Sequence, residues 1–530
     1  MKKFLLIIGI LQNCFFLHAQ THISGGALKP EQALMDIRHY NIVLEVRPDQ
    51  GYYEGFTEIK LDLQATSSML LFDLDSLFTV SGIWVDGVPV GFKHQSGLIR
   101  ITGKEAFSAG RHVVKVAYGG KPHIAVNPPW DGGIQWSRDS LGRHWVAMSC
   151  QEDGADIFFP CKDHPSDEPN EGVDMVITVP KGMVVAGPGL LQRQQTKGTK
   201  TTWHWKTNYT INNYCVVFNA GYYKVERRTY QTVAGRSVPM EYYVLDYNRH
   251  RAAKHLDLLE RSTRLLEKYF GEFPFAKEKI GIVETPHLGM EHQTMNAYGN
   301  RYRYTKIGKT DFDWLMHHEF GHEWWANKVS NKDWGHMWIQ EGICSFGDVL
   351  FYNDFGGKDI YLKRMKEIAL QTQNQLPIVQ GDVVDSRQAY HSDIYGKGAF
   401  FMHTLRYVLG DDVFFPALKA FATDPSFTYD QTVVTNDVLQ HFSKYAKKDL
   451  TPLFSLYLYS TDKLSVRVRE TAGNTYQIWL ENMAMPLPLD IQTTTGRQRL
   501  MLSGKAIKIT SGSMPVIDPD GYYLKRVTYE

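Results

Sequence analysis

Hydrophobic and polar residues alternate with a period of two along the first two hundred residues. The alternation is clear over residues 40–46, 57–63 and 114–118, where apolar side chains lie between mostly polar neighbours. A period of two with one polar face is typical of antiparallel strands in a half-buried sheet. The pattern predicts a large antiparallel β domain over residues 20–222.

The period changes at about residue 250. Residues 251–270 place leucines at helical spacing, and Gly271 follows as a stop signal. A second helix is predicted over residues 313–325, with Asp311 or Asp313 as the N-cap, and a third should carry Glu341. Further helices are predicted over residues 358–373, 398–409, 412–422, 435–445 and 450–459. A short strand-like run at 280–283 makes this a mixed α/β domain, which we place over residues 223–461.

Alternation returns after Ser460, over residues 464–468, 476–480 and 487–491. We interpret residues 462–530 as a small β-sandwich. The chain has 530 residues, which is too long for one ordinary core and suits about three domains. The predicted fold is therefore multi-domain α+β, with β domains on both sides of an α/β domain.

The first residues have the composition of a secretory signal peptide. Lys2 and Lys3 precede an apolar run over residues 4–11, and a small residue, Ala19, stands where a signal peptidase would cut. We predict a signal peptide over residues 1–19; an uncleaved anchor is the alternative. No later stretch is apolar enough to cross a membrane, so we expect an exported, periplasmic or secreted protein without integral membrane association.

The charge balance excludes some classes of partner. Lys and Arg number 58 and Asp and Glu number 57, which gives a net charge of +1. This net charge is too small to attract nucleic acid or an anionic membrane over a long range. The four cysteines outside the signal peptide are too few for a disulfide framework in so long a chain, and we expect buried free thiols at Cys150, Cys161, Cys215 and Cys344.

The segment His318-Glu319-Phe320-Gly321-His322 carries the chemistry. On a helix, His318 and His322 lie four residues apart and point from one face, so their imidazoles can bind one zinc ion. Glu341 follows His322 after a gap of eighteen residues and supplies a third ligand. Three protein ligands leave one position open, as in a catalytic zinc site, and we expect one Zn²⁺ per chain.

Two further observations bear on this interpretation. Trp324, Trp325, Trp334 and Trp338 surround the motif and suit an apolar shell around a metal, although ordinary core packing explains them as well. The spacing of the metzincin class would require Gly at position 325 and His at position 328, where this chain has Trp325 and Lys328. That class is excluded.

The expected mechanism follows from these parts. Zinc lowers the pKa of a bound water, Glu319 takes its proton, and Glu319 later returns the proton to a leaving amine. The developing oxyanion needs a hydrogen-bond donor. Tyr395 and Tyr390 are both candidates, and periodicity does not choose between them.

Several motifs in order resemble one family. The run over residues 318–327, with Glu341, resembles the zinc aminopeptidases that include aminopeptidase N and leukotriene hydrolase. Residues 338–342, 394–399 and 159–165 are similar to further motifs of that family. The resemblance covers residues 35–460 or more, and it implies a gluzincin metalloprotease with a thermolysin-like catalytic domain. Larger members carry a helical C-terminal domain, so the resemblance also implies a short form with a more open cleft.

The resemblance also assigns roles to residues. Tyr395 matches the tyrosine that stabilises the transition state, and Tyr390 matches a tyrosine of leukotriene hydrolase. Glu291, in Gly289-Met290-Glu291, matches the glutamate that binds the substrate's free α-amino group, and Gln151 matches a residue near that amine. We include Gly289 and Met290 in the substrate-binding set. Two positions depart from the family, which has Gly and Asn where this chain has Leu288 and His292.

We therefore expect an exported zinc aminopeptidase, a hydrolase that acts on peptides with a free N-terminus. One rival is a zinc endopeptidase with the same core. A second is an epoxide hydrolase, which would need Asp where this chain has Arg387. A third is a non-catalytic peptide-binding relative, against which the intact ligands and base argue. The sequence leaves the preferred N-terminal residue and the oligomeric state open.

Overall fold

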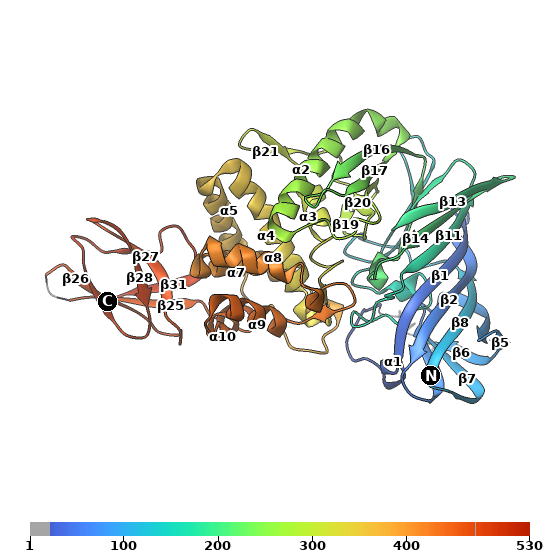
Figure 1. The fold of residues 1–530 in the computed structure, drawn as a ribbon, viewed down its shortest axis with the longest axis horizontal. Coiled ribbons are helices and arrows are strands. Elements are labelled where there is room, and N and C mark those ends of the chain that lie inside the picture. The colour runs from blue at the N-terminus through green and yellow to red at the C-terminus, as the bar shows by residue number, and fades with distance from the viewer. Residues whose placement is uncertain (1–21, 472) are drawn as a thin grey trace, which may run out of the picture.

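The computed structural model describes residues 22–471 and 473–530. The predicted signal peptide over residues 1–19 lies outside the described residues. Three regions follow one another along the long axis of the molecule: a β region, a mainly helical region and a second, smaller β region (Figure 1). The predicted fold class is confirmed.

The first region is built on an eight-stranded sheet of order β13-β14-β11-β1-β2-β8-β4-β5. Its strands are β1 (Met35–Arg47), β2 (Tyr52–Leu63), β4 (Phe78–Val85), β5 (Val88–Pro89), β8 (Gly110–Gly120), β11 (Val173–Pro180), β13 (Leu190–Lys197) and β14 (Lys200–Thr207). A short helix, α1 (Pro30–Ala33), precedes β1. Buried and half-buried residues alternate along β1 and β11, as the sequence predicts. One pair departs from the antiparallel prediction, because β1 and β11 run parallel.

Two smaller sheets complete this region. A three-stranded sheet contains β3 (Ser67–Asp73), β6 (Gly91–Gln95) and β7 (Leu98–Phe107). A four-stranded sheet contains β9 (Gly133–Arg138), β10 (His144–Ser149), β12 (Val184–Ala186) and β15 (Asn219–Gly221). The chain leaves β10 into a buried connection over residues 150–165, which holds the turn η1 (Ala155–Ile157) and a bond from the Tyr53 hydroxyl to Phe158 C=O of 2.6 Å. A second short turn, η2 (Asn213–Cys215), precedes β15.

The central region begins with a mixed five-stranded sheet of order β16-β17-β18-β20-β19. Its strands are β16 (Tyr223–Gln231), β17 (Ser237–Leu245), β18 (Ile280–Glu284), β19 (Gly289–Met290) and β20 (Asn296–Tyr298). Two minor pairs are β21 (Thr305–Ile307) with β22 (Thr310–Phe312), and β23 (Ser330–Asn331) with β24 (Thr432–Val433). Because β19 lies at the edge of the main sheet and ends at Met290, the next residue, Glu291, leaves the sheet there.

Helices make up the rest of this region. They are α2 (Ala252–Phe270), α3 (Trp314–Gly321), α4 (Trp338–Gly356), α5 (Lys358–Gln371), α6 (Ser386–Ala389), α7 (Asp393–Leu409), α8 (Asp411–Phe421), α9 (Thr435–Ala446) and α10 (Thr451–Leu458), with short turns η3 (Asp246–Arg251), η4 (Trp334–His336) and η5 (Pro425–Phe427). Gly271 ends α2 with φ 91°, a conformation that suits glycine. Asp313 is the N-cap of α3 and accepts from the backbone N–H of Met316.

Two predicted helix boundaries are wrong. The helix α3 ends at Gly321 instead of reaching residue 325, because the His322 ring bonds to Trp325 C=O and the chain turns through Ala326 at φ 148°. The helix α7 begins at Asp393 and not at residue 398. Gly396 and Gly398 weaken the helical signal in the sequence, which hides this start, and in the structure Gly398 packs against Gly342 of α4.

The last region consists of two small sheets, of order β29-β26-β25-β31 and β28-β27-β30. Their strands are β25 (Leu464–Glu470), β26 (Thr475–Leu480), β27 (Leu487–Thr493), β28 (Gly496–Leu502), β29 (Ile507–Thr510), β30 (Val516–Ile517) and β31 (Lys525–Tyr529). The Tyr522 ring stacks on Tyr407 of α7 at 3.8 Å between centroids, which joins this region to the helices.

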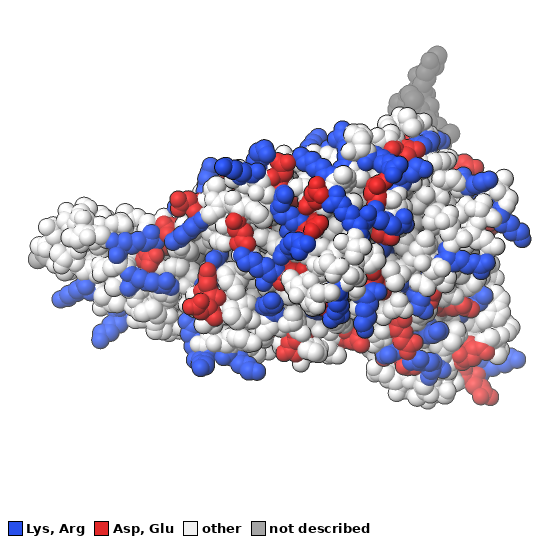
Figure 2. Space-filling model, turned by 45° about the horizontal axis from the view of Figure 1, so that its top comes forward, with Lys and Arg blue, Asp and Glu red and all other residues white. Residues whose placement is uncertain are grey.

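Positive and negative side chains are interspersed over the face seen in Figure 2, in keeping with the net charge of +1. Across residues 22–471 and 473–530, no helix combines the length and the apolar character that crossing a bilayer demands. Cys150, Cys161, Cys215 and Cys344 are buried free thiols, as predicted.

Candidate active site

A cleft of ≈ 170 Å³ lies where the first region meets the helices. One part of its lining comes from residues 129–130 and 151–152 of the β region, and the other from residues 288–291, α3, α4 and the start of α7. All ten predicted site residues line this cleft: Gln151, Gly289, Met290, Glu291, His318, Glu319, His322, Glu341, Tyr390 and Tyr395. The described lining includes no residue from the C-terminal region.

His318, His322 and Glu341 bring three ligand atoms together. The two imidazole Nε2 atoms are 3.2 Å apart, and Glu341 Oε2 is 3.5 Å from His318 Nε2 and 3.3 Å from His322 Nε2. A tetrahedral ion with bonds of about 2.0–2.1 Å holds its ligand atoms about 3.3 Å apart. Glu341 is 2% exposed and its Oε2 has no hydrogen-bond partner among the described residues. The types of ligand atom and the distances between them therefore fit a zinc ion.

Each imidazole is oriented by its other nitrogen. His318 Nδ1 donates to Asp348 Oδ2 at 2.9 Å, and His322 Nδ1 donates to Trp325 C=O at 2.8 Å. This leaves both Nε2 lone pairs free for a metal. Burial alone would raise the pKa of Glu341, but His322 and His318 together lower it to about 2, so it is a carboxylate.

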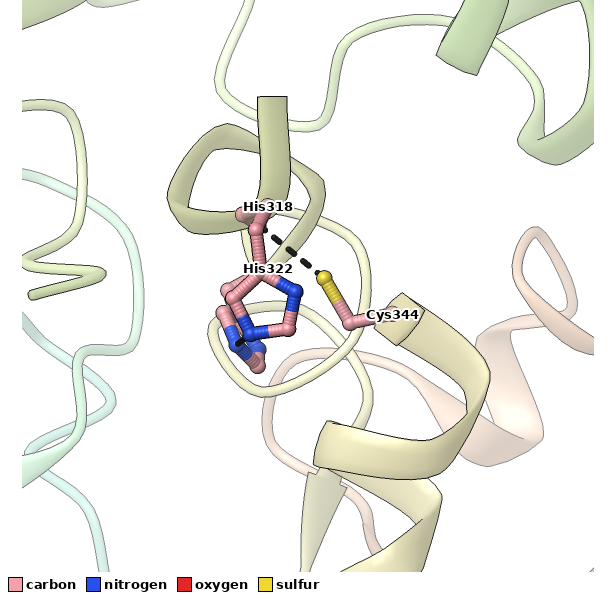
Figure 3. A group of neighbouring side chains, drawn as sticks. All are labelled: His318, His322 and Cys344. Carbon is pink, nitrogen blue, oxygen red and sulfur yellow. Dashed lines mark hydrogen bonds between the residues drawn. The ribbon is translucent and has the colours of Figure 1, made fainter. Parts of the chain in front are cut away.

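Cys344 approaches the histidines from one turn further along α4. Figure 3 shows its sulfur facing α3, where Sγ donates to His318 C=O at 3.0 Å. Gly321 permits this approach, because a Cβ there would lie 2.7 Å from the sulfur. The thiol thus holds α4 against α3, and its sulfur also lies within 4.8 Å of a ring nitrogen of each histidine.

Glu319 lies beside the ligand atoms and against the sheet edge. A Cβ on Gly289 would meet Glu319 Oε1 at 2.5 Å, so only glycine lets β19 come this close to the carboxyl group. Burial raises the pKa of Glu319 to about 8; His318 opposes the shift and Glu291 adds to it. A carboxyl group with such a pKa can exchange a proton near neutral pH.

Glu291 is the second carboxylate of the cleft. Its Oε1 accepts from Gln151 Nε2 at 2.6 Å and from the Tyr214 hydroxyl at 2.9 Å. Ligand atoms of Glu291, Glu319 and His322 lie within 4.8 Å of one another. The lining includes four glutamates and, among the described residues, neither Lys nor Arg. Such a site favours a cationic group beside the metal ligands.

The two candidate tyrosines occupy the same wall. The Tyr395 hydroxyl donates to the Tyr390 hydroxyl at 3.3 Å, and the Tyr395 ring is 6.1 Å from the His318 ring. Burial, with Glu341 adding to it, raises the pKa of Tyr395 well above its usual range, so its hydroxyl stays protonated. Tyr395 can therefore donate a hydrogen bond at neutral pH.

The two positions that depart from the family behave differently. Leu288 lines the cleft, whereas His292 is not among the lining residues. His292 is 1% exposed, and neither ring nitrogen has a hydrogen-bond partner in the described part of the chain. Burial lowers the pKa of His292 to about 3, so the ring is neutral.

Sequence reasoning missed three residues of the site. Asp348 lies seven residues after Glu341, on the same face of α4, so helical spacing could have found it. Tyr214 and Glu152 carry no such signal, because a tyrosine and a glutamate far from the motif resemble any others. Burial raises the pKa of Glu152 to about 8, with Asp153 and Glu341 adding to the shift.

A larger cavity of ≈ 540 Å³ adjoins the cleft. Trp314 and Tyr395 line both spaces, and the remaining walls come mainly from α4, α5 and α7. The cleft therefore borders a second open space at Trp314 and Tyr395.

Comparison with known proteins relates this site to one family. Residues 255–457, which are less than half of the chain, match the peptidase family M1 domain. This part of the chain is therefore similar to peptidase family M1. The matched residues include the metal ligands, Glu291, Glu319 and both tyrosines, whereas Gln151 lies outside them.

Individual relatives are distant. The chain is 24% identical to aminopeptidase N of Escherichia coli over 341 residues, which cover 59% of this chain and 38% of that protein. It is 19% identical to Tricorn protease-interacting factor F2 of Thermoplasma acidophilum over 490 residues, 85% of this chain and 58% of that protein. The chain thus spans well under two thirds of the length of both relatives.

Solved structures share the fold. A mutant M1 zinc metallopeptidase from Deinococcus radiodurans superposes with a TM-score of 0.66 at 20% identity, covering 82% of this chain and 95% of that one. The same mutant was also solved with a Tyr-Ser-Ala substrate, with a TM-score of 0.66 and 20% identity.

Proposed function

We propose that this protein is a zinc-dependent aminopeptidase that removes N-terminal residues from peptides. The observation that carries the proposal is the placement of Glu291, bonded to Gln151 and Tyr214, within 4.8 Å of Glu319 and His322. A buried carboxylate at that distance from the metal ligands pairs with the ammonium of a chain end and positions the first peptide bond for attack. The aminopeptidase N relatives and the M1 zinc metallopeptidase structures support the proposal.

His318, His322 and Glu341 would hold the zinc ion. Zinc supplies a Lewis acid and lowers the pKa of water. Glu319 accepts the proton of the attacking water and returns it to the leaving amine, a role that its pKa of about 8 allows. The Tyr395 hydroxyl donates to the oxygen that becomes negative as the carbonyl carbon turns tetrahedral. The leaving part of the peptide lies in the ≈ 540 Å³ cavity beyond Tyr395.

An aminopeptidase differs from an endopeptidase in its need for Glu291. The test is a panel of aminoacyl-coumarin substrates, each with a free and with an acetylated amine, assayed with and without a chelator. We expect cleavage of the free set alone, abolished by the chelator. Cleavage of the acetylated set would favour the endopeptidase, and activity that survives the chelator would refute the zinc assignment.

The variant Glu291→Gln tests whether the charge of Glu291 binds the α-amino group of the substrate. It keeps the shape of the side chain and its bond to Tyr214 but removes the charge. We expect KM for free-amine substrates to rise at least about tenfold, since a charged hydrogen bond contributes roughly 1.5–3 kcal/mol. Zinc content should stay as in the wild type. An unchanged KM would remove Glu291 from substrate binding.

We further propose that the protein is exported. The support is the sequence of residues 1–19 alone, with its two lysines, apolar run and Ala19. N-terminal sequencing of the protein recovered outside the cytoplasm should begin at Gln20, and recovery of an intact first residue would refute cleavage.

A further inference from the structure

A second cluster of metal-ligand side chains lies in the β region, apart from the cleft. His22 comes from the segment before α1, Asp75 from the turn between β3 and β4, and His123 from the loop after β8. One ligand atom of each residue lies within 4.8 Å of the other two. The His22 and His123 rings are 4.5 Å apart between centroids.

Two members of this cluster are buried with polar atoms left unpaired. His22 is 8% exposed and Asp75 is 1% exposed. Asp75 Oδ1 accepts from the backbone N–H of Leu77 at 2.9 Å, whereas Oδ2 has no hydrogen-bond partner within residues 22–471 and 473–530 and lies 3.6 Å from His22 Nε2. A buried carboxylate oxygen without a donor costs free energy that a bound cation would remove.

An arginine near this cluster contacts a carboxylate outside it. The nearby guanidinium of Arg387 lies 3.7 Å from Asp153.

We propose that His22, Asp75 and His123 form a second metal site, which binds zinc or another divalent cation that accepts nitrogen and oxygen ligands. Two neutral imidazoles and one carboxylate are a ligand set that zinc uses in proteins. The separation of 3.6 Å between His22 Nε2 and Asp75 Oδ2 is close to the spacing of about 3.3 Å that a tetrahedral zinc imposes. This proposal is independent of the catalytic one, since the two sites share no residue.

The site has a structural consequence for the cleft. Two residues after His22, Ser24 N–H donates to Glu152 C=O at 3.0 Å and Ser24 C=O accepts from Ser386 N–H at 3.0 Å. Glu152 follows Gln151 in one cleft wall, and Ser386 precedes Tyr390 in the other. An ion at His22 would therefore anchor the segment that joins the two walls.

Zinc stoichiometry tests the proposal. The full-length protein is exposed to zinc, passed through a desalting column and measured by elemental analysis. We expect two zinc ions per wild-type chain, one in His123→Gln, one in Asp75→Asn and one in His318→Ala. His144→Gln, the same substitution elsewhere in this region, is the matched control and should keep two.

The outcomes separate this proposal from the catalytic one. A wild-type chain with one zinc that His318→Ala removes overturns the second site and leaves the first. A chain that keeps one zinc in His318→Ala, and loses it when His123→Gln is added to that variant, supports the second site whatever becomes of the first. Equal zinc content in His123→Gln, Asp75→Asn and the wild type overturns it.

Thermal stability gives a readout that does not depend on activity. In the His318→Ala background, micromolar zinc should raise the Tm by several degrees, because an ion that binds only the folded chain stabilises it. Adding His123→Gln to that background should abolish the rise. A zinc-induced rise of equal size in both variants would overturn the proposal.

Discussion

Gly342 of α4 and Gly398 of α7 touch backbone to backbone. A Cβ built on Gly342 would lie 2.8 Å from the Cα of Gly398, and a Cβ on Gly398 would lie 2.8 Å from the Cα of Gly342. Gly342 follows Glu341, the predicted metal ligand, and Gly398 lies one turn after Tyr395. This contact therefore sets how close the ligand helix and the tyrosine helix can lie.

Gly342→Ala should damage both stability and activity. A methyl group at this crossing must push α4 away from α7, and overpacking of this kind costs about 1–3 kcal/mol. Glu341 and Tyr395 would move apart. We therefore expect a large fall in kcat and a smaller change in KM. Urea denaturation and steady-state kinetics measure the two effects.

The matched control is Gly396→Ala, on α7 as well. Its Cβ would make ordinary contacts of 3.8 Å with Ile368 and Thr372, and alanine favours a helix by about 1 kcal/mol over glycine. This variant should be as stable as the wild type or more so. Equal losses in both variants would show that the crossing has no special role.

Tyr395→Phe should lower kcat by about 10²–10³ with little change in KM, because the hydroxyl acts on the developing oxyanion and not on the bound peptide. Tyr390→Phe removes the hydroxyl 3.3 Å away and is the matched control. It should have the smaller effect. The assignment fails if Tyr390→Phe loses more activity than Tyr395→Phe.

Glu319→Gln should keep zinc and lose turnover by about 10²–10⁴, since an amide cannot accept the proton of the attacking water. Elemental analysis and kcat, measured on the same sample, check this result. His318→Ala is the contrast, because it should lose zinc and activity together. Substantial turnover by Glu319→Gln would exclude the glutamate as the base.

Asp348→Asn should weaken zinc binding by about 10–100-fold, because its carboxylate holds His318 Nδ1 at 2.9 Å and aligns Nε2 with the metal. Competition with a chelator of known affinity measures the change. Asp354→Asn, further along α4, contacts Lys268 and Tyr269 and should leave zinc affinity unchanged. A similar loss in both variants would indicate a general effect of charge.

Glu168 makes folding stability depend on pH. Burial raises its pKa to about 8, with Asp167 adding to the shift and Ser330 opposing it. In the unfolded chain its pKa is about 4.3, so between the two values only the folded chain keeps the proton. Stability from this group is full below pH of about 4.3 and falls by at most about 1.4 kcal/mol per pH unit until about pH 8.

Glu168→Gln removes this dependence. Relative to the wild type, the variant should gain stability as the pH rises from 5.5 to 8, as measured by urea denaturation at each pH. Glu105→Gln, at an exposed position, controls for the loss of one charge. A stability difference between Glu168→Gln and wild type that does not change with pH would contradict the prediction.

The sequence by itself determined the local features of this protein. The period of two over residues 40–46 predicts β1, the leucine spacing over residues 251–270 predicts α2, and the four-residue step from His318 to His322 predicts two ligands on one face. Each signal depends on neighbours within one or two turns, where backbone geometry alone relates the side chains. The family resemblance added Glu291, Tyr395 and Gln151 as expectations.

Only the tertiary structure decided what meets across long separations in the chain. The bond from Tyr214 to Glu291, the crossing at Gly342 and Gly398, and the cluster around Asp75 join elements that periodicity treats as unrelated. The end of α3 at Gly321 is also such a case, since the His322 ring is drawn into a bond with Trp325 C=O. Packing selects these contacts from the whole chain at once, and a local pattern carries no information about them.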